Sequence, residues 1–369
     1  MQCLLELLRG QSIDRAIVEA EWEAALTLAE EEHVLSWTAA RIRSGQSPVA
    51  PAIAARLDQI EHDAAIAAFY WNSELKGVLR AFEQCDIRVV PLKGPFLAER
   101  LYGATALRVS RDLDLLVVRA DLARAEAVLA AIGFAPRVRD DYHRPWHRET
   151  TWVELHHDVE NPLAFDFDVE SALQRVYPAV FQGGSCWQLA PEDELLFLCL
   201  HATRHRFERL SLIVDLQLAF EKLISTADEW RPRSEVAGLS NLLTLGLAMA
   251  RRLQPNLNVA VDFHTPRNQR KHLERLADRL WNRLLTEHRE PLDWRAAHAF
   301  FLEVEFPGWP RLRRRCRHFQ ILLSRVIAPD YAFAARFGLH SAWQARMLRP
   351  VRLLCGAMRL PRRGGRRAL

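Results

Sequence analysis

The stretch RVSRDLDLLVV, residues 108–118, decides how the α/β part of this chain folds. Its second part, DLDLLVV at 112–118, is a short apolar run with β-branched residues, which predicts a buried strand. Side chains alternate between the two faces of a strand, so Asp112 and Asp114 share one face. Aspartate is unfavourable within strands, and a pair of aspartates there indicates a function.

Two carboxylates at positions i and i+2 form a clamp for a hard divalent cation. Mg²⁺ prefers oxygen ligands and usually keeps water and substrate phosphates in its coordination shell. Such a metal neutralises charge on a phosphoryl group during its transfer. The alternative is that Asp112 and Asp114 lie on a solvated strand face, because the D-x-D pattern is common. The pattern alone leaves both interpretations open.

Upstream of this strand, IRVVPL at 87–92 predicts a second buried strand that stops at Pro91. Lys93 and Gly94 follow, and Pro95 opens a helix. Glycine lets the backbone approach a ligand closely, a helix N-terminus favours phosphate, and lysine adds a positive charge. The alternative for an isolated Lys-Gly is a tight turn with a surface lysine.

Downstream, a helix is expected from Asp121 to Gly133, and strands are expected at 134–138 and 151–157. In the last strand, TWVELHH, Glu154 and His156 share a face. Glu154 is a third carboxylate that could hold a metal or act as a general base. The alternative is an edge strand whose polar residues face water.

Helical patterns flank this unit on both sides. Apolar residues recur at spacings of three and four from Pro51 to about Gln84, and a helical pattern resumes at Pro191. The fold class is therefore predicted to be α+β, a small mixed sheet with helices between helical regions. The expected parts are an N-terminal helical region (1–85), an α/β core (86–185), a helical domain (186–305) and a C-terminal helical region with a tail (306–369).

The composition is that of a globular protein, with 49% apolar and 26% charged residues. No apolar run is long enough for a transmembrane helix, and the N-terminus lacks the features of a signal peptide. Six scattered cysteines without a C-x-x-C pair argue against a zinc site and against a disulfide framework. A cytoplasmic location is expected.

The C-terminal region carries a strong positive charge. Residues 310–369 hold fifteen arginines, no lysine and one acidic residue, Asp330, whereas the rest of the chain has an acidic excess. This asymmetry predicts an acidic partner such as a peptide, and we favour that over nucleic acid. The alternatives are solvated helix faces, packing against the helical domain, and binding to an anionic membrane surface. The last nine residues are expected to be disordered.

Four blocks, in this order and spacing, resemble the family of uncharacterised nucleotidyltransferases. That family belongs to the DNA polymerase β-like nucleotidyltransferase superfamily, and the resemblance runs from about residue 30 to about residue 300. The blocks are VVPLKGPFLAERLYG (89–103), RVSRDLDLLV (108–117), VELHHDV (153–159) and LCLHATRHRFERLSLIVDL (198–216).

The resemblance implies a minimal nucleotidyltransferase core, an NTP such as ATP as substrate, and Mg²⁺ as cofactor. Asp112 and Asp114 match the metal-binding D-x-D of the family, and Glu154 matches its third acidic position. Lys93 and Gly94 stand where other superfamily members carry Gly-Ser, which raises the question of how the triphosphate is held.

Further residues are expected to bind the nucleotide. Arg108 and Arg111 precede the D-x-D as in the family and could contact phosphates, and His156 shares the face of Glu154. His201 and His205, at i and i+4 on one helical face, recur in the family pattern and are expected to line the site. The alternative for the two histidines is packing between subdomains, and Asp215 could pair with an arginine.

The predicted function is transfer of a nucleoside monophosphate from an NTP to an unidentified acceptor. Family members stand beside genes for ribosomally made peptides, such as lasso peptides, or for surface polysaccharide, which implies a peptide or a sugar phosphate as acceptor. One alternative is a kinase-type phosphotransferase on the same scaffold. Another is a non-catalytic adaptor that binds a nucleotide or an acidic peptide.

Overall fold

The computed structural model divides the chain into two compact units, Met1–Arg137 with Asp141–Gly308, and Val138–Asp140 with Trp309–Leu369. The C-terminal Arg-rich block lies outside the described residues, apart from four isolated positions, and so do the expectations for its helices, tail and partners. The account below therefore concerns the first unit. Described residues are 1–11, 17–45, 49–137, 143–159, 167–224, 239–259, 263, 265–286, 300–301, 303–304, 316, 343 and 346–347.

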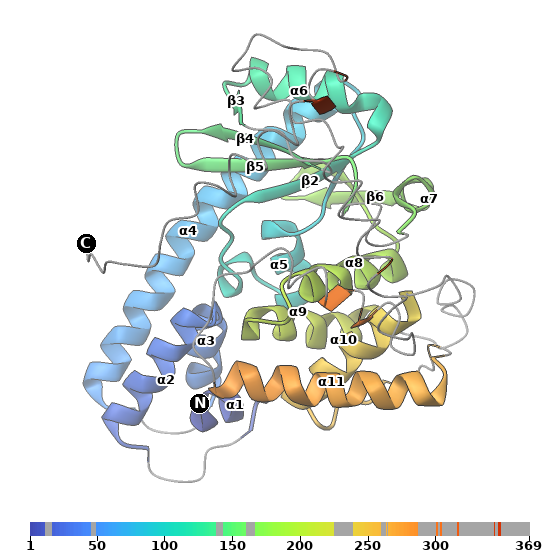
Figure 1. Cartoon of the computed structure of the whole chain (residues 1–369). Helices are drawn as coiled ribbons and strands as arrows, with labels where there is room; N and C mark the ends of the chain where they lie inside the picture. Colours follow the sequence, from blue (N-terminus) through green and yellow to red (C-terminus); the bar gives the residue numbers. More distant parts are fainter. Residues whose placement is uncertain are drawn as a thin grey trace. The chain divides into compact units, whose positions relative to one another are not determined.

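The N-terminal region is helical, as the sequence predicts. Its longest helix, α4, begins at Pro51 in the first turn and ends at Gln84, the two positions given by the apolar spacing. The shorter helices pack beside the N-terminal part of α4 around a separate apolar cluster (Figure 1). These helices are α1 (Gln2–Leu8), α2 (Glu19–Glu31) and α3 (Leu35–Ser44).

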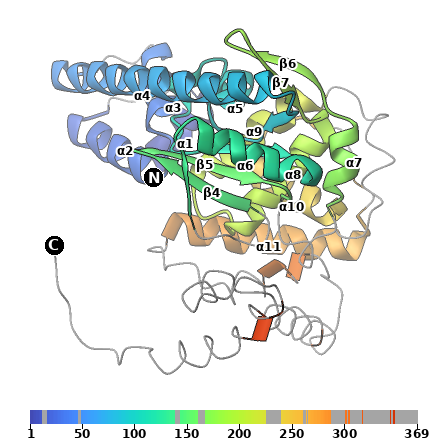
Figure 2. The same ribbon diagram turned by 90° about the horizontal axis from the view of Figure 1, so that it is seen from above.

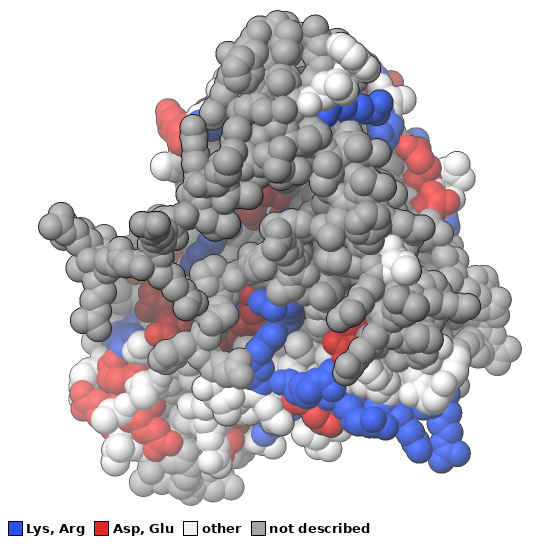
Figure 3. Space-filling view, in the orientation of Figure 1, with Lys and Arg blue, Asp and Glu red and all other residues white. Residues whose placement is uncertain are grey.

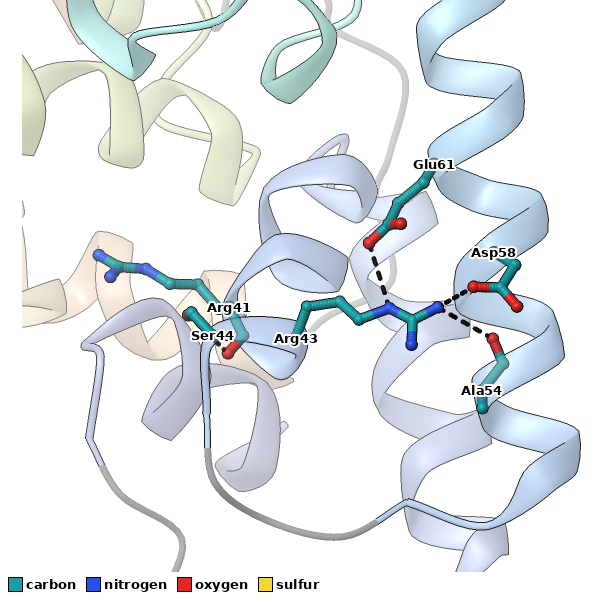
Figure 4. Close-up of polar contacts among 6 residues, drawn as sticks. All are labelled: Arg41, Arg43, Ser44, Ala54, Asp58 and Glu61. Carbon is teal, nitrogen blue, oxygen red and sulfur yellow. Dashed lines mark hydrogen bonds and ion pairs between the residues drawn. The ribbon is translucent and has the colours of Figure 1, made fainter.

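A polar contact ties the end of α3 to α4 (Figure 4). Arg43 donates hydrogen bonds to Glu61 at 3.3 Å and to the carbonyl of Ala54 at 3.2 Å, and it also pairs with Asp58. The side chain of Arg41 points away from this group. Because exposed ion pairs of this kind stabilise a fold only weakly, the apolar cluster supplies most of the attachment of α3.

A five-stranded mixed sheet forms the centre of the unit, with strand order β1-β2-β5-β4-β3. Strands β2 and β5 run parallel, and the other neighbours are antiparallel. A small mixed sheet between helical regions confirms the predicted α+β class. The strands are β1 (Val89–Pro91), β2 (Leu113–Val117), β3 (Ala135–Pro136), β4 (His143–Arg148) and β5 (Thr151–His156).

The sequence did not predict β4. Its letters, HRPWHR, include two arginines and a proline and show no regular apolar alternation, so the stretch resembles a loop. In the structure β4 pairs with β5 over its whole length, and Trp146 is buried in the apolar cluster that includes side chains of α4 and α6, while its neighbours are half-buried. Pairing with β5 therefore overrides the weak local preference.

Helices cover both faces of the sheet. In Figure 1, α6 (Leu122–Ala131) lies above it, and α5 (Gly94–Tyr102), α8 (Pro191–Arg204) and α9 (Leu210–Leu223) lie below it. Apolar side chains on one face of β2 and β5, such as Leu115, pack with α4 and α6. On the other face, Leu116 packs with the helical region, while the carboxylates lie beside it.

The helical region follows the sheet and a second hairpin, which the sequence also did not predict. Helices α8, α9 and α10 pack on one another (Figure 2). Most residues of α10 are buried. No helix in the described part of the chain is both long and apolar enough to cross a membrane. The remaining elements are α7 (Val169–Gln174), β6 (Tyr177–Phe181), β7 (Gly184–Gln188), α10 (Leu239–Leu253) and α11 (Arg267–Thr286), with one-turn helices at Thr105–Leu107 and Arg119–Asp121.

Charge is unevenly distributed over the first unit. In Figure 3, acidic side chains gather over the N-terminal helices, and a band of basic side chains follows α11. The basic residues of that band include Arg267, Arg270, Lys271 and Arg275. The residues of this band precede the Arg-rich C-terminal block in the sequence.

Two glycines in helices should respond in opposite ways to replacement by alanine. At Gly246 in α10, an added methyl group would lie 2.5 Å from Cys199 Sγ, whereas at Gly77 in α4 nothing lies within 4 Å. We expect Gly246→Ala to lower the free energy of unfolding by about 1–3 kcal/mol through overpacking. Gly77→Ala should raise it by about 0.5–1 kcal/mol. Urea unfolding of both variants measures the effect, and a neutral Gly246→Ala would show that α8 and α10 can separate at this point.

Candidate active site

Parallel pairing of β2 with β5 assembles the candidate site. It places Asp114 directly opposite Glu154, forty residues further along the chain. His156 lies two residues beyond Glu154 on the same face, and Asp112 lies just before β2 in a bend. Asp114, Glu154 and His156, which the sequence singled out, thus come together on one face of the sheet.

The side chains of these residues converge. His156 Nε2 lies 3.1 Å from Asp114 Oδ1 and 3.4 Å from Glu154 Oε2. One ligand atom from each of the three residues lies within 4.8 Å of the other two. Asp114 and His156 are buried and Glu154 is half-buried. Carboxylate oxygens suit Mg²⁺ and Mn²⁺, and an imidazole nitrogen suits transition metals, so the donor set fits a divalent cation.

Lys93 and Gly94 lie on the other side of Asp114. Lys93 Nζ is 3.0 Å from Asp114 Oδ2. Gly94 has a φ of +70° at the first residue of α5, and an added Cβ would lie 3.5 Å from the carbonyl oxygen of Asp112. The left-handed φ favours glycine here. The N-terminus of α5 therefore comes close to the carboxylates, where its free N–H groups can bind phosphate.

The charges of the site balance one another in the described chain. Burial favours a neutral Asp114, but Lys93 and His156 outweigh it and hold its pKa well below the usual range. Burial opposes protonation of His156, yet hydrogen bonds to Asp114 and Glu154 raise its pKa. Burial, with the nearby charge of Asp114, raises the pKa of Asp112 to about 6. Lys93 and the protonated form of His156 thus offset the charge of the carboxylates that could hold a metal.

Arg108 is held by a residue of the helical region. Its Nε and one terminal nitrogen donate to the two carboxylate oxygens of Asp215 in α9, at 2.8 and 2.9 Å. The hydroxyl of Tyr102 donates to Asp215 at 2.7 Å. The charge of Arg108 offsets a small part of the rise in the pKa of Asp112. Arg111, by contrast, is exposed in the bend before Asp112.

Comparison with known proteins identifies the chain. A model of the family described as uncharacterised nucleotidyltransferase matches residues 18–255, which is more than half of the chain. The chain belongs to this family. It is therefore a nucleotidyltransferase, as the sequence motifs predict, and an NTP is a substrate.

The nucleotidyltransferase is similar to the crystal structure of ANT(2")-Ia in complex with adenylyl-2"-tobramycin, at 14% sequence identity and a TM-score of 0.34. That similarity covers 48% of this chain and 97% of the other. No curated protein matches the chain.

His201 in α8 and His205, the residue just after that helix, differ in their surroundings. The rings of His201 and His205 lie 4.7 Å apart, and Phe197 stacks on His201. Burial and then the charge of Lys93 hold the pKa of His201 well below its usual value, so His201 is neutral and near the nucleotidyltransferase site. His205 lies 3.7 Å from Glu208. The expected role of both histidines in lining the site stays a prediction.

Two residues of the site face were not singled out by the sequence. His143 in β4 stacks on His156 with ring centroids 5.2 Å apart, and its Nε2 is 3.9 Å from Glu154 Oε2. It was missed because β4 was not predicted. Trp152, two residues before Glu154, shares its face, and strand alternation alone could have found it.

The elevated pKa of Asp112 has a measurable consequence. Below a pH of about 6 its carboxyl holds a proton and offers no charge to a cation. Metal ligands must be deprotonated, so the affinity for Mn²⁺ should fall as the pH drops through about 6. Titration calorimetry on wild type and Asp112→Asn tests this, since the variant should bind more weakly with a flatter pH dependence. Identical pH profiles in the two proteins would contradict a role for Asp112 in metal binding.

Proposed function

We propose that this nucleotidyltransferase moves a nucleoside monophosphate from an NTP to a hydroxyl acceptor in a Mg²⁺-dependent reaction. The observation that carries the proposal is the convergence of Asp114 and Glu154 beside the N-terminus of α5. A cation site next to a phosphate site is the arrangement that phosphoryl and nucleotidyl transfer require.

Asp112, Asp114 and Glu154 are the proposed metal ligands, with the imidazole of His156 as a further donor beside them. When bound, Mg²⁺ neutralises charge on the phosphates and orients them for attack. The carboxylate oxygens of the site fit this ion. Lys93 and His156 both contact Asp114, so a cation at this carboxylate would compete with these two contacts.

The remaining residues have proposed roles in holding the nucleotide. Lys93 and the backbone N–H groups at Gly94 hold the phosphates that leave as pyrophosphate. Arg108, oriented by Asp215, adds a fixed guanidinium near the carboxylates. Arg111, His156, His201 and His205 complete the proposed nucleotide contacts.

The acceptor oxygen would attack the α-phosphorus as the bond to the bridging oxygen breaks. Glu154 is half-buried and lies on the side of Asp114 away from Lys93, so it can receive the proton of the acceptor hydroxyl. A peptide hydroxyl and a sugar phosphate are the two acceptor classes that we propose. The Arg-rich C-terminal block is a proposed binding region for an acidic peptide.

The position of a label in the product tests the proposal. Purified protein is incubated with Mg²⁺, ATP labelled at the α or the γ position, and a lysate of the source cell. We expect the α label to enter a product, and an Asp112→Ala/Asp114→Ala protein to give no product. Transfer of the γ label alone would identify a kinase on this scaffold. Nucleotide binding that survives chelation of Mg²⁺, without transfer of either label, would favour the adaptor.

A further inference from the structure

Beside the carboxylates, the site face of the sheet carries an exposed aromatic side chain. Trp152 lies two residues before Glu154 in β5 and is 41% exposed, whereas its neighbours Thr151 and Val153 are buried. Across the sheet, Trp152 pairs with His147 of β4. Tryptophan offers a large apolar surface for contacts. Because this exposed tryptophan lies two residues from a candidate catalytic carboxylate on the same strand face, it is placed to contact a substrate.

Two further side chains complete this surface. The ring of His147 lies 5.6 Å from that of Trp152, and the guanidinium of Arg137 lies 5.7 Å from the same ring. The backbone N–H of Arg137 donates to the carbonyl of Pro145 in β4 at 2.8 Å, which holds Arg137 beside the strand. We call Trp152, His147 and Arg137 the Trp152 platform.

The tautomer of His147 follows from its partner. Nδ1 of His147 lies 3.0 Å from the carbonyl oxygen of Ala135. A carbonyl oxygen only accepts hydrogen bonds, so Nδ1 carries the hydrogen, and Nε2 of the neutral ring is an acceptor. The platform therefore offers an acceptor nitrogen, a cation and an aromatic ring, next to the carboxylate of Glu154.

The order of the strands indicates which substrate meets this platform. Lys93 and the N-terminus of α5 lie at the β1 side of Asp114, whereas Glu154 and the Trp152 platform lie on β5 and β4, on its other side. In a phosphoryl transfer the attacking and leaving oxygens are roughly in line. If pyrophosphate leaves toward Lys93, the acceptor approaches over β5 and β4. The platform is therefore on the acceptor side.

The chemistry of the platform selects a class of acceptor. Arg137 lies over part of the Trp152 ring, and the exposed remainder of that ring can pack on the apolar face of a substrate ring, while Arg137 can pair with a phosphate. His147 Nε2 and the carboxylate of Glu154 both accept hydrogen bonds, so they match a ring with more than one hydroxyl. A serine or tyrosine side chain presents only one hydroxyl, whereas a sugar phosphate presents several together with an anionic group.

We propose that the Trp152 platform binds a sugar phosphate, one hydroxyl of which is the acceptor of the nucleotidyl group. This inference rests on the proposed function, because the direction in which pyrophosphate leaves assigns the platform to the acceptor. The hydroxyl oxygen forms the new bond to the α-phosphorus, and the bond from that phosphorus to the bridging oxygen breaks. Pyrophosphate takes the electron pair of the broken bond, and Glu154 receives the hydroxyl proton.

Binding of defined probes tests the proposal. Glucose 1-phosphate and ribose 5-phosphate are titrated into the full chain and followed by saturation-transfer NMR. We expect Trp152→Ala and Arg137→Ala each to weaken probe binding by about tenfold. Trp152→Phe should keep most of the affinity. The matched control is Arg88→Ala, because Arg88 is also an exposed arginine over a tryptophan ring, Trp187, at 4.1 Å.

A second titration separates this inference from the proposed function. The same proteins are titrated with ATP and Mg²⁺, and we expect Trp152→Ala to bind ATP as the wild type does. ATP binding without binding of either probe, or probe binding that Trp152→Ala leaves unchanged, would overturn the sugar phosphate while the proposed function stands. Trp152-dependent binding of an acidic tyrosine peptide in place of the probes would overturn it in favour of a peptide. A wild type that binds no ATP would instead contradict the proposed function.

Discussion

Replacing Asp114 with asparagine should lower the rate of nucleotidyl transfer by about 10³-fold or more. Asp114 is the residue on which the site converges, because one of its oxygens faces Lys93 and the other faces His156. An asparagine has nearly the same shape but no charge, so it holds a divalent cation weakly. It also removes the carboxylate that faces Lys93, so the charge of that side chain loses its partner in the site. Transfer of the α label from ATP, measured with saturating Mg²⁺, checks the effect.

The control for Asp114→Asn is a second aspartate of the same α/β core. Asp121, just beyond the far end of β2, pairs with the exposed Arg124, and Asp121→Asn should leave the transfer rate within about twofold of the wild type. Thermal unfolding of both variants shows whether each is folded under assay conditions. A folded Asp114→Asn protein with more than about a tenth of the wild-type rate would exclude Asp114 from the metal site.

The second large effect is expected at Asp215. This carboxylate accepts two hydrogen bonds from Arg108 and one from Tyr102, and all three side chains are at least four-fifths buried. Asp215→Ala leaves the guanidinium and the phenol without their partner, so we expect the free energy of unfolding to fall by about 3–5 kcal/mol. Urea unfolding measures this loss. The same variant should also bind ATP more weakly, because Arg108 is no longer oriented.

Two comparisons interpret the Asp215 result. A double variant, Asp215→Leu/Arg108→Met, removes both charges and should recover much of the lost stability, because no buried charge then lacks a partner. Asp121→Ala breaks the more exposed pair with Arg124 and should cost no more than about 1 kcal/mol. If Asp215→Ala is no more costly than Asp121→Ala, the contact between α9 and the loop before β2 does not hold the helical region in place.

The Arg108–Asp215 contact joins the site to a distant part of the chain. The two residues are 107 positions apart, and Asp215 lies in a helix whose other buried residues are almost all apolar. A buried aspartate in such a helix needs a charged partner. The sequence indicated that Asp215 could pair with an arginine, but it did not indicate which arginine. The structure names Arg108, the residue that the sequence assigned to phosphate binding.

The sequence by itself determined the elements whose signal is local. The long helix α4 follows from the spacing of its apolar residues, and its start follows from Pro51. The apolar run after Asp112 gives strand β2, although the strand begins at Leu113 and leaves Asp112 in the bend before it. The turn at Gly94 follows from a glycine placed between strand and helix. These features depend on neighbours in the chain, so no tertiary contact is needed to read them.

Only the tertiary structure decided which residues meet. Strand β2 pairs with β1 on one side and with β5 on the other, although β3 is closer to β2 along the chain. The pairing with β5 places Glu154 and His156 beside Asp114. The insertion of β4 next to β5 adds His143 to the site and His147 to the Trp152 platform. Strand pairing depends on contacts between segments far apart in the chain, and those contacts leave no periodic signal in either segment. The sequence therefore supplies the residue types that the site needs, and the tertiary structure determines which of these residues lie together.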